Sequence, residues 1–166
     1  MATTVTWFRN VILRDLDTLD AQIRAYPSDA SLWRHVDSIT NPGGILIHHL
    51  CGNLRHFVGS CIGGSDFRRD RDAEFARRDI TRAELQQMVA ATQAEVAAGF
   101  DRLEPIGLDE RFPEAVGGAT LVTGQFLVHL TAHFAYHLGQ IDYHRRVATG
   151  GGPVPGMQSA LALVER

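Results

Sequence analysis

The sequence has few cysteines, no long apolar run and little net charge. Its two cysteines, Cys51 and Cys61, fall in one expected helix, where ten positions of separation place them roughly 15 Å apart. That distance excludes a disulfide-stapled scaffold and fits a reducing compartment. No apolar run approaches the ~20 residues of a membrane span, and the first residues lack the pattern of a signal peptide. We therefore expect a cytoplasmic protein that does not associate with a membrane.

The charges nearly balance, and the composition is that of an ordinary globular protein. Sixteen basic and 19 acidic residues give a formal net charge of -3, which favours neither a nucleic-acid partner nor a basic membrane-surface protein. Apolar residues make up 45% of the 166 residues, and we expect one domain over residues 1–166. The eight histidines need an explanation, because most of them fall in two clusters.

Four segments carry apolar residues at helical spacing, and no strand pattern persists. They lie at about residues 4–26, 42–62, 81–103 and 121–148. Asn41 followed by Pro42 predicts the start of the second helix, and a capping box from Thr81 to Glu84 predicts the start of the third. The glycines from Gly150 onward predict the end of the fourth. We expect an all-α fold, an antiparallel four-helix bundle.

A long, charge-dense connection separates the second and third expected helices. Residues 65–80 contain similar numbers of arginines and acids, which predicts a self-paired or solvated loop and not a phosphate-binding tract. The connection is long enough to cross the bundle, so the helices need not follow a simple up-and-down order. A short helical or extended piece is also expected at residues 32–33, and a short final helix at residues 159–164.

Two histidines of the fourth helix, His133 and His137, are spaced to bind one metal ion together. Residues four apart on a helix differ by about 40° in direction, so their side chains project side by side. His49 of the second helix can supply a third imidazole from a facing helix. A helical histidine pair is often only hydrogen-bonded, but burying several unpaired imidazoles costs free energy that coordination offsets. The pattern predicts one divalent ion between these three side chains.

Further polar residues of the two helices are candidates to line the site or to hold a ligand imidazole through its second nitrogen. For each of them, plain packing or exposure to solvent is the competing interpretation. They are Asn53, His56, His129, Tyr136 and Gln140. Asp142 is a further candidate to orient a ligand, whereas His35 and His144 are expected at the surface.

Two motifs make the chain similar to the DinB superfamily of four-helix metalloproteins. They are His-Leu-x-Gly-Asn at residues 49–53 and His-x-x-x-His-x-Gly-Gln-Ile at residues 133–141. Matching segments at residues 69–75 and 81–85 lie in the same order, so the resemblance covers most of the chain. It implies a DinB-like bundle, frequently a homodimer, with one divalent ion, often zinc or nickel, on the three histidines named above. Characterised relatives include bacillithiol S-transferases and a mycothiol-dependent maleylpyruvate isomerase.

The expected three-histidine site has the chemistry of an enzyme, because three neutral imidazoles leave a divalent ion with an open position. Water there has its pKa lowered to about 7 and can act as a hydrolase nucleophile, whereas a thiol there is activated for S-transfer. The resemblance favours the thiol route, with a low-molecular-weight thiol as co-substrate and a small-molecule substrate. The alternative is a non-catalytic, metal-stabilised dimeric bundle. A bundle without any metal is the third hypothesis.

Overall fold

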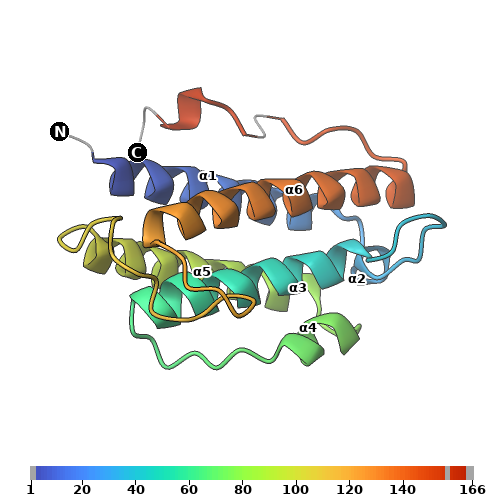
Figure 1. Ribbon diagram of the computed structural model, residues 1–166. Helices are drawn as coiled ribbons and strands as arrows, with labels where there is room; N and C mark the ends of the chain where they lie inside the picture. Colours follow the sequence, from blue (N-terminus) through green and yellow to red (C-terminus); the bar gives the residue numbers. More distant parts are fainter. Residues whose placement is uncertain (1–2, 156–157, 164–166) are drawn as a thin grey trace.

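Helices and their connections make up the computed structural model, which describes residues 3–155 and 158–163 (Figure 1). Its elements are α1 (Thr4–Ala25), α2 (Asp29–Leu32), α3 (Gly43–Leu54), the π-helix η1 (Arg55–Ile62), α4 (Arg71–Ala76), α5 (Arg82–Leu103), α6 (Thr123–Thr149) and the 3-10 helix η2 (Leu161–Leu163). Within these ranges no strand forms, and β-type pairing is confined to three isolated bridges. The prediction of an all-α fold is confirmed.

Four long helical segments lie side by side: α1, α3 with η1, α5 and α6 (Figure 1). Two of them, α1 and α6, run in one direction, whereas α3 with η1 and α5 run in the other. The chain after η1 returns along the length of the molecule to α4 before α5 begins, so the helix order is not a simple meander. Helix α3 packs against α6, and α4 packs against α3. These contacts bring α3, α4 and α6 into one neighbourhood.

Apolar side chains from the four long segments share one core. Its largest fully buried members are Tyr26, Phe100, Phe126 and Phe134. Burial of a side chain of this size stabilises the fold by about 1.5–3 kcal/mol, which is more than helix propensity contributes at any one position. No helix within residues 3–155 and 158–163 combines the length and apolar character that crossing a membrane requires.

The ends of the helices follow local chemistry. The Thr81 side chain accepts a hydrogen bond from the backbone of Glu84, whose carboxylate accepts one from the N–H of Thr81 at 2.8 Å, as the capping box predicts. Gly150 ends α6 in the left-handed conformation, with φ of 70°. The prediction for α3 is wrong in detail, since Pro42 and not Asn41 precedes its first residue and no side chain caps it.

Of the three short elements, one was predicted from the sequence, one was predicted only in part and one was not predicted. The 3-10 helix η2 lies inside the expected segment 159–164, of which residue 164 is outside the described residues. Helix α2 overlaps the piece expected at residues 32–33 only at Leu32. Helix α4 forms inside the connection at residues 65–80, where no helix was expected. It is the element that matters most for the site.

The second long segment is not one continuous α-helix, because η1 follows α3 directly. A π-helix closes i→i+5 hydrogen bonds and therefore has a wider turn than an α-helix. The wide turn packs closely on α5, where a Cβ added to Gly99 would lie only 2.5 Å from the carbonyl oxygen of Val58. In such a helix, residues five apart share a face, and His56 and Cys61 are five apart.

Candidate metal centre

Three histidine side chains from α3 and α6 converge between these helices. Nε2 of His49 lies 3.4 Å from Nε2 of His133, and the rings of His133 and His137 are 4.5 Å apart between centroids. The ring of His49 lies 5.3 Å from that of His133 and 5.4 Å from that of His137. One nitrogen of each ring lies within 4.8 Å of the others. His49 is buried and the other two are partly buried, so the group is reachable from solvent.

A buried carboxylate fixes the proton on His49. Oε2 of Glu74 lies 2.9 Å from Nδ1 of His49, and Arg69 donates two hydrogen bonds to the same carboxylate at 2.7 and 2.9 Å. Burial raises the pKa of Glu74, but the hydrogen bonds from His49 and Arg69 outweigh it and hold that pKa below its usual range. Because an ionised carboxylate only accepts, Nδ1 of His49 must donate. The lone pair on Nε2 is then free to face the other two imidazoles.

Gln140 has the same effect on His137. Its Oε1 lies 2.6 Å from Nδ1 of His137, so the amide oxygen accepts the ring proton and Nε2 keeps its lone pair. His133 has no such support, and its buried Nδ1 has no hydrogen-bond partner among the described residues. Burial and the neighbouring imidazoles lower the pKa of His133 to about 4, and burial lowers the pKa of His137 as well. Both rings are neutral near pH 7, as metal ligands must be.

The donor set fits a divalent ion. Two imidazole nitrogens on one tetrahedral zinc, each at about 2.0–2.1 Å, are about 3.3–3.4 Å apart. The Nε2 atoms of His49 and His133 have that separation, 3.4 Å. A neutral His133 that binds through Nε2 would carry its proton on Nδ1, which has no partner among the described residues. Within the described part of the chain, no fourth ligand-type side chain joins the group, so an ion here keeps an open position.

A helix of six residues, α4, carries the carboxylate to His49. Asp70 caps it by accepting a hydrogen bond from the N–H of Ala73 at 2.9 Å. Gly52 of α3 faces the carboxylate so closely that a Cβ there would overlap Oε1 of Glu74. The glycine of the His-Leu-x-Gly-Asn motif therefore makes room for the group that supports His49.

The role of Glu74 was not predicted from the sequence. The balanced charges of residues 65–80 predict self-pairing, and Arg69 does pair with Glu74, but the pair is buried beside His49 instead of being solvated. The signal that could have found it is the segment 69–75, which carries part of the DinB resemblance.

Two of the other candidates border the three histidines. The ring of His129 stacks on that of His133 at 6.0 Å, and the ring of Tyr136 lies 5.3 Å from that of His137. Both side chains are exposed, Tyr136 to 65%. They therefore lie on the exposed side of the histidine group.

Two further candidates lie away from the histidine group. Asn53 is buried on α3, one turn after His49, and within the described residues no hydrogen bond joins it to the three histidines. His56 contacts Cys61 and Glu114 instead, as described below.

Two expectations for the end of α6 are wrong. Asp142 is buried and accepts a hydrogen bond from Arg145 at 3.0 Å, so it does not orient a ligand imidazole. His144 is fully buried, and both of its ring nitrogens have partners. The hydroxyl of Tyr26 lies 2.8 Å from Nδ1, and Nε2 donates a hydrogen bond to the carbonyl of Arg34 at 2.9 Å. Burial lowers the pKa of His144, and the ring is neutral.

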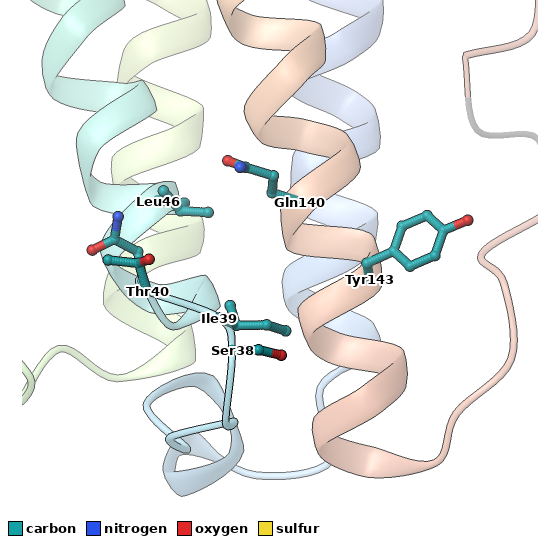
Figure 2. Close-up of a pocket in the computed structure, with 7 residues that line it drawn as sticks. Ser38, Ile39, Thr40, Leu46, Gln140 and Tyr143 are labelled. Atoms are coloured by element: carbon teal, nitrogen blue, oxygen red, sulfur yellow. The ribbon is translucent and has the colours of Figure 1, made fainter.

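A cavity of about 240 Å³ lies beside the site, between residues 38–41, α3 and α6 (Figure 2). The amide of Gln140 points from α6 toward α3 across this cavity, whereas the ring of Tyr143 points away from it. Because Gln140 also bonds Nδ1 of His137, the cavity and the histidine group share one wall.

The match to a protein family covers the helices that carry the site. No curated protein and no solved structure matches the chain. The family described as Mycothiol-S-transferase matches residues 7–150, which include the three histidines together with Glu74 and Gln140. That family is part of the DinB/YfiT-like superfamily, so the resemblance found in the sequence is confirmed. On a match of this extent, the chain belongs to the mycothiol-S-transferase family.

Proposed function

We propose that this chain is a divalent-metal-dependent thiol S-transferase whose ion is held by His49, His133 and His137. The observation that carries the proposal is the convergence of three imidazoles, two of which have their tautomer fixed by Glu74 and Gln140. The family, whose description names mycothiol, supports a thiol as the co-substrate. At its open position, a divalent ion lowers the pKa of a thiol and so supplies a thiolate nucleophile. Zinc and nickel both suit three imidazoles.

The supporting residues keep the ligands ready to bind. Arg69 keeps the Glu74 carboxylate ionised, and the carboxylate keeps the proton of His49 on Nδ1. The same hydrogen bond makes Nε2 of His49 a more basic ligand. Gln140 holds the ring of His137 from within α6. The orientation of two of the three ligands, His49 and His137, is thus set by side chains of α4 and α6 before any ion arrives.

The thiol and its partner substrate enter from different sides in this proposal. Ser38, Thr40 and Asn41 line the cavity next to Gln140, and their hydroxyl and amide groups suit a polar thiol such as mycothiol. The small electrophile approaches on the solvent side, past His129. The thiolate sulfur bonds to the electrophilic carbon, the leaving group departs with its electron pair, and the thiol proton passes to solvent through His129.

The four long helices are, in our interpretation, a DinB-like four-helix bundle that forms a cytoplasmic homodimer. The support for the dimer is a stripe of apolar side chains on α6 that are all more than half exposed, namely Val128, Tyr136, Tyr143 and Val147. Light scattering after gel filtration is expected to give twice the chain mass. Tyr143→Glu is expected to give the single chain mass, and Trp7→Glu, an exposed site on α1, is the matched control.

Metal analysis together with a conjugation assay tests the function. The untagged chain is expected to carry one divalent ion and to couple mycothiol to a chromogenic electrophile. His133→Ala is expected to lose both, and His35→Ala, at a site whose side chain is 78% exposed, is expected to lose neither. Ester hydrolysis without any thiol requirement would favour the hydrolase alternative. A metal-loaded chain inert in both assays would leave the non-catalytic, metal-stabilised dimer.

A further inference from the structure

A second group of metal-ligand side chains lies outside the three-histidine site. His56 and Cys61 come from η1, and Glu114 comes from the connection between α5 and α6. Nε2 of His56 lies 3.1 Å from one oxygen of Glu114, Sγ of Cys61 lies 3.7 Å from the other, and Sγ lies 3.9 Å from Nε2. The S-transferase proposal makes no use of these residues.

The spacing of these atoms is compatible with a shared ion. With Zn–S at about 2.3 Å and Zn–N at about 2.0–2.1 Å, the nitrogen–sulfur edge of a tetrahedral site is about 3.6 Å. Sγ of Cys61 lies 3.9 Å from Nε2 of His56, close to that edge. Glu114 contacts the imidazole with one oxygen and the thiol with the other, so its carboxylate faces both ligands. One ligand atom of each side chain lies within 4.8 Å of the others, so small side-chain movements would bring all three onto one ion.

The π-helix is the reason that two of the ligands meet. In an α-helix, residues five apart point about 140° away from each other, which would separate His56 from Cys61. In η1 the i→i+5 hydrogen bonds place such residues one above the other. Wide turns of this type are rare and occur frequently at functional sites. Here the turn brings an imidazole and a thiol onto one face.

The connection that carries Glu114 is held in place on both sides of it. Two residues earlier, Phe112 is buried, and its ring lies 4.5 Å from that of Phe126. Two residues later, Val116 and Ala119 exchange backbone hydrogen bonds at 2.9 and 3.0 Å. Among the described residues no arginine pairs with Glu114, so its charge faces an imidazole and a thiol.

We propose that His56, Cys61 and Glu114 bind a second divalent cation of the zinc class, with water completing its coordination. One thiolate, one imidazole and one carboxylate form a donor set typical of zinc. Binding replaces the Cys61 S–H bond by a sulfur–metal bond and releases the proton to solvent, with no change of oxidation state. The ion would fasten the connection between α5 and α6 to η1.

Titration of the metal-free chain with cobalt(II) tests this second site, because only a thiolate ligand gives a near-ultraviolet charge-transfer band. The wild-type chain is expected to bind two cobalt ions, one of them with the band. Cys61→Ala is expected to lose the band and one ion. Cys51→Ala, which removes the other, fully buried thiol of the same long segment, is expected to keep both. His133→Ala is expected to keep the band while losing the other ion, which separates this site from the proposed catalytic one.

Two further measurements do not depend on the Cys61→Ala chain folding. Zinc is expected to protect the Cys61 thiol of the wild-type chain from a disulfide reagent. Glu114→Gln is expected to weaken the band-forming site about tenfold or more, whereas Glu110→Gln, on an exposed part of the same connection, leaves it unchanged. Binding of a single cobalt ion without the band, or a band that survives in Cys61→Ala, would overturn the proposal.

Discussion

The Glu74→Gln variant tests whether the carboxylate beside His49 is part of the metal site. The substitution keeps the shape of the side chain and removes its charge. Glu74 accepts hydrogen bonds from Nδ1 of His49 at 2.9 Å and from Arg69 at 2.7 and 2.9 Å. An amide offers one acceptor oxygen where the carboxylate offers two, and it presents N–H groups to a donor. The variant therefore weakens the support of His49 and leaves Arg69 incompletely paired.

The substitution is expected to lower metal affinity and folding stability by different amounts. Removing the partner of a metal-bound imidazole costs about 10- to 100-fold in metal affinity, which is about 1.4–2.8 kcal/mol. Breaking a buried ion pair costs about 3–5 kcal/mol of folding stability. The Arg69 side chain is only 12% exposed, so we expect the lower end of that range, about 3 kcal/mol, because glutamine retains one acceptor.

Zinc affinity and stability are measured separately. Competition with a chromophoric chelator gives the zinc affinity, and urea unfolding of the metal-free chain gives the stability. Glu95→Gln is the matched control, because Glu95 also pairs with an arginine, Arg55, at 2.6 Å and does not touch the three histidines. This partly exposed pair contributes about 1 kcal/mol or less to stability. The control is expected to bind zinc as the wild-type chain does.

Two outcomes would refute this reasoning. Zinc affinity of Glu74→Gln within twofold of the wild-type value would mean that the carboxylate does not set the ligand state of His49. Equal losses of affinity in Glu74→Gln and Glu95→Gln would mean that general destabilisation, and not the contact with His49, lowers the affinity.

Three further predictions concern packing, pH and metal removal. Gly52→Ala places a Cβ against Glu74 and is expected to lower both zinc affinity and melting temperature, whereas Gly139→Ala, in open space, leaves zinc affinity unchanged. Because burial holds the pKa of His144 below 6.5, the metal-free chain is expected to lose stability as pH falls below about 6.5, where unfolded histidine gains a proton. Urea unfolding at about pH 7.5 and 5 is expected to show a flatter dependence for His144→Asn but not for exposed His35→Asn. Chelation is expected to lower the melting temperature, and an unchanged value after complete metal removal would contradict a bound ion.

Local spacing was sufficient to find the histidines of α6. His133 and His137 lie one turn apart among apolar residues, and any α-helix over this stretch places them side by side. Pairing them with His49 needed more, because it depends on α3 and α6 being neighbours. The family motifs supplied that information, and the structure shows the two helices in contact.

Glu74 could not be found from periodicity. Helix α4 has six residues, fewer than two turns, so no apolar stripe can develop. Its contact with His49 spans 25 positions and depends on space left by Gly52. A charged residue in a charged connection gives no local sign that it will be buried.

Long-range contacts also explain the other differences. His144 looks like a surface residue near a helix end, but the partners that accommodate it, Tyr26 and the carbonyl of Arg34, are more than a hundred positions away in sequence. The change from α3 to η1 has no local marker either. It coincides with the close approach of η1 to Gly99 of α5, which only the packed structure reveals.

The distance in sequence between His49 and His133 has a consequence for folding. An ion shared by His49 and His133 would act as a removable cross-link that closes a loop spanning 84 positions. For a loop of that length, the chain-entropy estimate of the stabilisation is roughly 4–5 kcal/mol, comparable to that of a long-range disulfide. The two halves of the cross-link meet only after α6 has docked on α3, so the ion enters late and thereafter slows the separation of these helices.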